Sequence, residues 1–203
     1  LVNALLGQVP EFESSESVEI PPAKLLGIRR KSTLGDFEPL PPLPATPFSQ
    51  SDLLVNATGQ PNFGSELKAE LATAKDVDLI CAFVIWSGVR HVRPALEELI
   101  DRGGRVRVIT TTYMGATEKD AVDALVEIGA HVKVAMDART TKLHAKSWLL
   151  QREGGINTAF VGSSNLSHTA LFEGLEWNVR LSEADAGHLI DRVQMTFESH
   201  WES

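Results

Sequence analysis

Four residues in the last third of the chain have types and spacing that could support catalysis. His144 and Lys146 are two residues apart, and Asn165 ends a Gly-Ser-Ser-Asn segment upstream of Glu176. Alternate side chains of a β-strand share a face, so His144 and Lys146 are expected to point the same way. An imidazole nucleophile, a fixed cation, an amide donor and a carboxylate that orients the imidazole suit attack on a phosphodiester.

The phosphate-binding roles follow from this chemistry. His144 is the predicted nucleophile, and it would form a phosphohistidine intermediate that divides hydrolysis into two steps. Lys146 and Asn165 would hold the non-bridging oxygens and stabilise the charge of a five-coordinate transition state. Ser163, which shares the turn with Asn165, is expected to add a hydroxyl hydrogen bond to the substrate.

A carboxylate is needed to orient the imidazole. Glu176 would accept the Nδ1–H of His144 and leave Nε2 free for attack, as carboxylates do in other histidine-based sites. Glu173 is the alternative if the turn after Asn165 is longer than expected.

Aromatic residues are predicted near the same site. The nearly unbroken apolar run 77–86 is typical of a strand buried on both faces, and it would end at Trp86 and Ser87. Ligands of open α/β sheets bind beyond the carboxyl ends of the strands. We therefore expect Trp86, Ser87 and Tyr113 to contact substrate by stacking or hydrogen bonding. Burial of Trp86 in the core is the alternative.

The order of elements predicts an α/β fold. Helical patterns occur over 65–74, 90–101, 117–128 and 182–201, and strand patterns over 77–86, 105–111, 131–135, 143–150, 158–162 and 176–181. Strand–helix alternation in the first half favours parallel pairing with helices packed on the sheet. We expect a mixed, mostly parallel sheet that is flanked by helices on both faces.

The N-terminal segment differs from the rest. Residues 1–46 contain glutamates interspersed with serines, followed by proline clusters that interrupt regular structure. We interpret residues 1–46 as an extended arm or linker and residues 47–203 as the folded domain. Because the chain begins with Leu1, we expect it to be part of a longer protein.

Composition narrows the function classes. The chain has 203 residues, a net charge of −8 and a single cysteine, Cys81, which lies in the apolar run and is expected to be a buried thiol. No secretory signal or membrane-spanning run is visible, so we expect a cytoplasmic protein without a membrane partner. No metal-ligand motif or nucleotide-binding P-loop occurs, so we expect neither a metal nor a cofactor. Arg139, Lys142, Lys146 and Arg152 suggest a local phosphate-binding surface.

The His-x-Lys pair, the Gly-Ser-x-Asn turn and the following Glu176 resemble the phospholipase D superfamily, in particular its bacterial nuclease branch. Residues 78–84, 108–117 and 161–167 look like the phospholipase D-like domain at the N-terminal end of bacterial superfamily II DEAD/DEAH-type helicases. The resemblance covers about residues 47–201. The family signature has an aspartate five residues after the lysine, whereas this chain has Gln151.

The resemblance implies a phospholipase D-like fold and a metal-independent phosphodiesterase that acts on nucleic acid, chiefly DNA. Because the motif occurs once and family members with one motif build the site across a two-fold axis, it also implies a homodimer formed through the active-site face. A helicase module would follow the domain in the full-length protein. The alternatives are a non-catalytic nucleic-acid-binding domain of the same fold and a phospholipase.

Overall fold

A computed structural model describes residues 35, 42–57, 59–136 and 143–203. One compact unit spans Pro41–Ser203. Most of the predicted arm, residues 1–46, lies outside the described residues, as does the segment 137–142.

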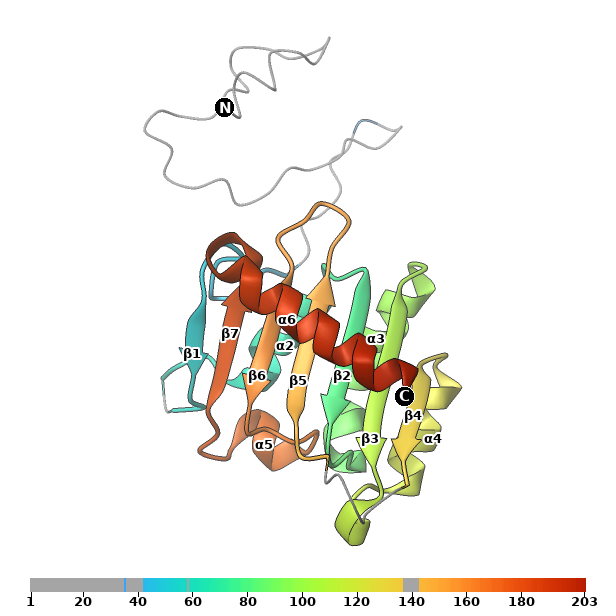
Figure 1. Ribbon diagram of the computed structural model, residues 1–203. Coiled ribbons are helices and arrows are strands. Elements are labelled where there is room, and N and C mark those ends of the chain that lie inside the picture. Colours follow the sequence, from blue (N-terminus) through green and yellow to red (C-terminus); the bar gives the residue numbers. More distant parts are fainter. Residues whose placement is uncertain (1–34, 36–41, 58, 137–142) are drawn as a thin grey trace, which may run out of the picture. The chain divides into compact units, whose positions relative to one another are not determined.

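The described residues form a seven-stranded mixed sheet (Figure 1). Its strands are β1 (Asp52–Leu54), β2 (Asp76–Cys81), β3 (Arg105–Thr111), β4 (His131–Ala135), β5 (Lys146–Gln151), β6 (Thr158–Gly162) and β7 (Asn178–Ser182), in the order β1-β7-β6-β5-β2-β3-β4. Only the β2/β3 and β3/β4 pairs are parallel. The mixed α/β sheet is confirmed, but most of its pairs are antiparallel, because β5, β6 and β7 follow one another as adjacent strands that reverse direction.

Helices cover both faces of the sheet, as predicted. One face carries α2 (Phe63–Leu71), α3 (Trp86–Asp101), α4 (Lys119–Glu127) and α5 (His168–Phe172), and α6 (Glu183–Glu202) crosses the other face diagonally (Figure 1). A short 3₁₀ helix, η2 (Tyr113–Gly115), follows β3. The main core lies between the sheet and the four-helix layer, and two smaller apolar clusters lie beneath α6.

Several predicted boundaries were wrong. β2 ends at Cys81 and α3 begins at Trp86, so the apolar run 77–86 is a strand, a connection and a helix start rather than one strand. Residues on both sides of the junction are buried, and hydrophobicity alone does not mark such a change. The helix expected over 65–74 spans 63–71 instead, and Asn62 caps it by accepting the N–H of Ser65 at 2.8 Å. The helix expected over 182–201 matches α6 closely, and Ser182 caps it, since its hydroxyl accepts the N–H of Ala184 at 3.2 Å.

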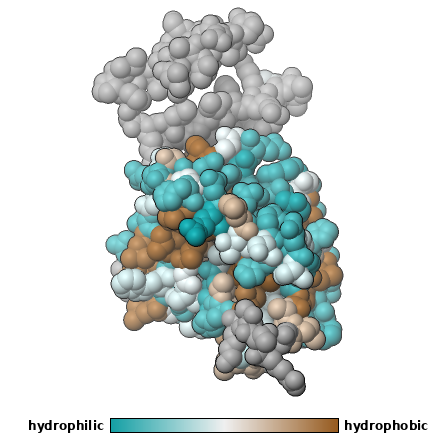
Figure 2. All heavy atoms as spheres, viewed as in Figure 1, coloured by the Kyte–Doolittle hydropathy of each residue, from teal (hydrophilic) through white to brown (hydrophobic). Residues whose placement is uncertain are grey.

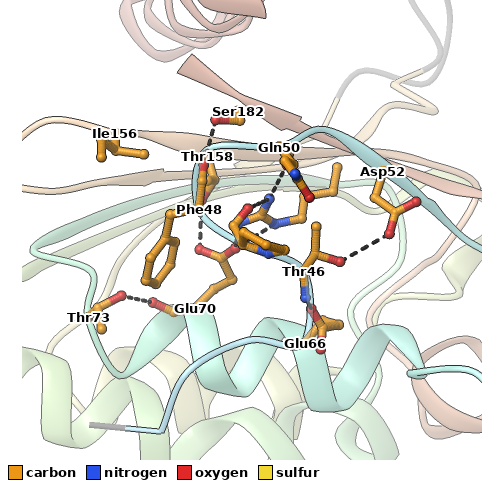
Figure 3. A network of polar contacts seen from close by, with 12 residues as sticks. Thr46, Phe48, Gln50, Asp52, Glu66, Glu70, Thr73, Ile156, Thr158 and Ser182 are labelled. Atoms are coloured by element: carbon orange, nitrogen blue, oxygen red, sulfur yellow. Dashed lines mark hydrogen bonds and ion pairs between the residues drawn. The ribbon is translucent and has the colours of Figure 1, made fainter. Parts of the chain in front are cut away.

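A buried carboxylate connects α2 to the antiparallel half of the sheet (Figure 3). The carboxylate of Glu70 is fully buried and forms ion pairs with Arg152 and Arg180, which has no accessible surface either. The hydroxyl of Thr158 donates to the same carboxylate at 2.8 Å. The ring of Phe48 lies 4.4 Å from the Arg152 guanidinium and limits its contact with water. Two guanidinium groups therefore depend on one carboxylate for charge compensation inside the protein.

The segment before β1 is attached to this network. The backbone N–H groups of Ala45 and Thr46 donate to the buried carboxylate of Glu66 at 2.9 and 3.2 Å. Arg180 donates to the carbonyl oxygen of Pro47 at 3.0 Å. These contacts begin at Ala45, slightly before the boundary that the sequence predicted.

A second ionic cluster attaches α6 to the other half of the sheet. Arg107 on β3 donates to both oxygens of the buried Asp78 at 2.7 and 2.8 Å, and to Glu198 of α6 at 3.0 Å. These hydrogen bonds from Arg107 lower the pKa of Glu198. The Arg107 guanidinium also lies 4.7 Å from the ring of Phe197, so the C-terminal part of α6 is held by both charge and packing.

Replacing Glu70 by glutamine should destabilise the fold strongly. Glu70→Gln keeps the volume but leaves the guanidinium groups of Arg152 and Arg180 buried without a counter-charge, which typically costs about 3–5 kcal/mol. Urea denaturation of the wild type and the variant would measure the loss. Asp123→Asn, which removes an exposed ion pair with Lys119, is the control and should have little effect. Equal stability of Glu70→Gln and wild type would contradict this account of the network.

Candidate active site

The predicted pair His144 and Lys146 is positioned at one end of the two central strands, β5 and β2. β5 pairs with β2 so that Lys146 lies opposite Cys81. His144 precedes β5 rather than lying within it, although the pairing continues through a hydrogen bond from the N–H of Ala82 to the carbonyl oxygen of Ala145 at 3.2 Å. His144 is exposed, whereas Lys146 is buried.

The structure brings His144 and Lys146 together. The Lys146 Nζ atom lies 3.0 Å from Nδ1 and 3.1 Å from Nε2 of the His144 ring, and it donates to the His144 carbonyl oxygen at 2.7 Å. The ring of Phe83 packs edge-on against the imidazole, with 6.1 Å between centroids. Burial lowers the pKa of Lys146, and Cys81 and Glu176 oppose this shift. The ammonium group is therefore fixed against the imidazole.

The Asn165 turn is held against the connection between β2 and α3. The side-chain oxygen of Asn165 accepts the N–H of Phe83 at 3.3 Å, and the N–H of Leu166 donates to the Cys81 sulfur at 3.2 Å. α3 approaches this turn so closely that a Cβ atom on Gly88 would lie 2.4 Å from the Leu166 carbonyl carbon. Phe83 therefore contacts both residues: its backbone N–H binds Asn165, and its ring packs against His144.

The two candidate carboxylates have different partners. Glu176 accepts a hydrogen bond from the hydroxyl of Ser163, and that hydroxyl accepts the N–H of Trp177 at 3.2 Å. Glu173 instead accepts from Nε2 of His168 at 3.1 Å. Within the described ranges, neither carboxylate is hydrogen-bonded to His144. Ser163 therefore holds Glu176 at the site, and the orienting role of Glu176 stays a prediction.

The predicted substrate-binding residues lie on segments that follow strands. Trp86 is the first residue of α3 and is 42% exposed, so it is not buried in the core. The Ser87 hydroxyl accepts the N–H of His168 at 3.3 Å, which links α3 to the end of the Asn165 turn. Tyr113 lies in η2, after β3. Contact of Trp86, Ser87 and Tyr113 with substrate stays a prediction.

The predicted cationic surface needs correction. Arg152 is engaged with the buried Glu70 and is not available to bind phosphate. Arg139 and Lys142 lie outside the described residues. Gln151, at the position of the family aspartate, ends β5 opposite Asp76. It therefore lies about 16 Å along the strand from Lys146 and does not alter the site directly.

A groove that the sequence did not reveal opens beside His144. It has a volume of about 500 Å³ and lies between α6 and the sheet. From α6 it is lined by Arg192, Thr196 and His200 among others, and from the start of β5 and the residues before it by the segment 144–147. The helical pattern in the sequence predicted which side of α6 packs on the sheet. It did not predict which sheet residues would line the groove together with this helix.

No group of three or more histidine, cysteine, aspartate or glutamate side chains within the described ranges is arranged to hold a metal ion. No helix among the same residues has the length and apolar character needed to cross a bilayer.

Residues 67–201 match the family model described as "Cardiolipin synthase, PLD-like domain". The chain belongs to this phospholipase D-like family. No curated protein matches it significantly. The motif-based expectation of phospholipase D-like membership is thereby confirmed, whereas the helicase association is not tested by this match.

Solved structures share the phospholipase D-like fold at low identity. NucT from Helicobacter pylori has a TM-score of 0.59 and 16% identity, and the match covers 76% of this chain and 96% of NucT. Nuc from Salmonella typhimurium, described as a phospholipase D family member, has a TM-score of 0.52 and 17% identity over 75% of this chain and 95% of Nuc. Phosphatidylserine synthase from Haemophilus influenzae has a TM-score of 0.52 and 13% identity over 71% of this chain and 37% of that one.

The Cys81 thiol should be inert in the folded protein. Its side chain is buried beneath the Asn165 turn, and burial raises the pKa of the thiol to about 11. Because the thiolate is the reactive form, a thiol-specific reagent at pH 8 should label Cys81 only after denaturant unfolds the chain. Rapid labelling without denaturant would show that the turn opens readily.

Proposed function

We propose that this phospholipase D-like domain hydrolyses phosphodiesters of nucleic acid, chiefly DNA, without a metal ion and through a phosphohistidine intermediate. The observation that carries the proposal is the contact of the buried Lys146 ammonium with both ring nitrogens of the exposed His144. A nucleophile and a cation for the same phosphate are thus held together. The asparagine and glutamate of the motif are carried by neighbouring turns.

In the first step, Nε2 of His144 attacks phosphorus, a P–N bond forms, and the bond to the leaving oxygen breaks. Lys146 and Asn165 stabilise the negative charge on the non-bridging oxygens. In the second step, water attacks phosphorus, the P–N bond breaks, and the imidazole is released. The leaving oxygen takes a proton in the first step, and the attacking water loses one in the second, so a second acid–base group is required.

Glu176 would orient the nucleophile when substrate binds. Its carboxylate is at present bonded to the Ser163 hydroxyl. A phosphate oxygen that accepts the Ser163 hydrogen bond would release this carboxylate to accept the Nδ1–H of His144. The proposed exchange gives Ser163 two successive partners, the carboxylate before binding and the phosphate after it.

The second acid–base group is most simply supplied by a homodimer. The chain contains the His-x-Lys motif once. In a two-fold dimer formed through the active-site face, His144 of the partner subunit would protonate the leaving oxygen. The sequence resemblance to the bacterial nuclease branch supports nucleic acid as the substrate, and its resemblance to the helicase-associated subgroup supports a helicase module in the full-length protein. A domain of the same fold that only binds nucleic acid is the alternative.

DNA cleavage should persist in the presence of a chelator. The proposed chemistry uses imidazole, ammonium, amide and carboxylate side chains, and none of its steps needs a metal ion. His144→Ala should reduce the cleavage rate by on the order of 10³-fold or more, because it removes the attacking atom. Gel assays with EDTA would measure both effects.

The controls separate cleavage from binding and from contamination. Cleavage by His144→Ala at the wild-type rate would indicate a contaminating nuclease. Loss of all wild-type cleavage in EDTA would contradict the metal-independent mechanism. If wild type and His144→Ala bind DNA equally but neither cleaves it, the binding-domain alternative is favoured.

Subunit mixing tests the shared site. Wild type is exchanged with a large excess of His144→Ala, so that most wild-type subunits enter mixed dimers with only one nucleophilic imidazole. Activity per wild-type subunit should then fall strongly. Exchange with an excess of active Asp123→Asn protein, altered at an exposed ion pair of α4, is the control. Undiminished activity per wild-type subunit, or a monomer by light scattering, would refute the dimeric site.

A further inference from the structure

Three ionisable side chains join α3 to α5 in the four-helix layer. His168 lies between the other two: its Nδ1 atom is 2.9 Å from Nε2 of His91 on α3, and its Nε2–H donates to Glu173, the residue that follows α5, at 3.1 Å. This cluster lies in the layer behind the sheet in Figure 1, on the opposite side from the α6 face that Figure 2 shows. Neither His91 nor His168 takes part in the proposed chemistry.

Packing fixes the two imidazole rings. The ring centroids of His91 and His168 lie 4.9 Å apart, and both rings contact the ring of Phe172, at 4.9 and 5.3 Å. α2 approaches Phe172 closely, since a Cβ atom on Gly64 would lie 2.4 Å from its ring. The His168 side chain is 35% exposed, so it can exchange protons with water. The pair is therefore held in place and can still titrate.

The two imidazoles can form this hydrogen bond only in some protonation states. An ionised carboxylate only accepts, so Nε2 of His168 carries a hydrogen in its bond to Glu173. While the pair of rings holds at most one extra proton, one of the two facing nitrogens donates and the other accepts. When both rings are protonated, both facing nitrogens carry a hydrogen and neither can accept. The bond between His91 and His168 is therefore lost when the second proton binds.

The neighbouring charges determine the pH at which this occurs. Burial lowers the pKa of His91, and Arg90 of α3, the His168 ring and Lys68 of α2 act in the same direction. Glu173 faces the pair as an anion and favours a proton on His168. Because folding lowers the pKa of His91, the contact stabilises the fold at neutral pH. It is lost as the pH falls through this pKa, below the ordinary histidine value of 6.5.

The start of α5 is also the end of the Asn165 turn. The N–H of Ser167 donates to the Asn165 carbonyl oxygen at 2.9 Å, and the hydroxyl of Ser167 caps α5. The next residue, His168, donates its backbone N–H to the hydroxyl of Ser87 on α3 at 3.3 Å. The backbone and the ring of His168 thus both attach the turn to α3. Loss of the ring contact weakens this attachment three residues from the Asn165 amide.

We propose that His91, His168 and Glu173 form a proton-sensitive clamp that positions Asn165. At neutral pH the clamp holds α5 against α3 and keeps the Asn165 amide in place. When the second proton binds, the bond between His91 and His168 breaks, the start of α5 separates from α3, and cleavage slows. The effect on cleavage rests on the proposed function, whereas the clamp itself does not.

Amide hydrogen exchange measured by NMR tests the clamp independently of turnover. In wild type, protection of the Leu166 and His168 amides, corrected for the intrinsic pH dependence of exchange, should fall about tenfold between pH 7.5 and pH 5. His91→Gln should keep its protection at both pH values, because a neutral amide can donate to or accept from the His168 ring in every state. His131→Gln, at the exposed start of β4, is the control and should respond to pH like wild type.

Two further variants test the direction of the effect. Glu173→Gln removes the anion that favours the added protons, so the fall in protection should move to lower pH. His91→Leu removes the hydrogen bond at every pH, so its protection should be low throughout. High protection in His91→Gln beside low protection in His91→Leu would show that the hydrogen bond, rather than the volume of the side chain, holds the turn.

The position of the Asn165 amide and the cleavage rate provide two more measurements. The side-chain amide resonance of Asn165 should shift between pH 7.5 and pH 5 in wild type but not in His91→Gln. DNA cleavage by wild type should fall over the same range by about tenfold more than cleavage by His91→Gln, as expected for the loss of one phosphate contact.

The outcomes separate the clamp from the proposed function. Equal protection of the wild-type turn at both pH values would overturn the clamp. A fall in protection that persists in His91→Gln would assign the pH response to another group and would also overturn it. The same pH dependence of cleavage in wild type and His91→Gln would overturn the effect of the clamp on catalysis. Absence of DNA cleavage, together with the expected changes in protection and in the Asn165 resonance, would refute the proposed hydrolysis and support the clamp.

Discussion

The antiparallel pairing of β2 with β5 is the constraint on which the rest of the structure depends. β2 belongs to the parallel half of the sheet and β5 to the antiparallel half, so this pair joins them. Its register places Lys146 opposite Cys81, so the segment that follows β2 and the segment that precedes β5 meet at the same end of these central strands. A shift by one residue would turn Lys146 to the α6 face and remove Trp148 from the main core.

Local patterns predicted much of the fold. Strands expected over 105–111, 131–135 and 158–162 match β3, β4 and β6, because breaks in the apolar pattern mark where each begins and ends. Strand direction in the second half was harder to predict, since parallel and antiparallel strands can have the same apolar pattern. The start of α3 was missed because the residues from 82 to 86 are all apolar, so the hydrophobic run continues without interruption from β2 into the helix.

The candidate site was predictable where its residues are neighbours in the chain. His144 and Lys146 meet because they are two residues apart, and Asn165 and Ser163 share one turn. Contacts between distant segments were not predictable in this way. Arg152 looked like a phosphate ligand, yet its partner is Glu70, 82 residues earlier, and the wall of the groove comes from α6. Neither the spacing of residues in the sequence nor its composition predicts which helix crosses which strand.

The direct junction of β7 and α6 limits how the groove can change during evolution. Ser182 is both the last residue of β7 and the cap of α6, so no linker lies between them. Insertion of one residue there would rotate the helix by about 100° and replace the whole wall of the groove. Substitutions at Arg192 or Thr196, by contrast, change one contact each. Homologues should therefore conserve the length of this junction and vary the groove through point substitutions on one helix face.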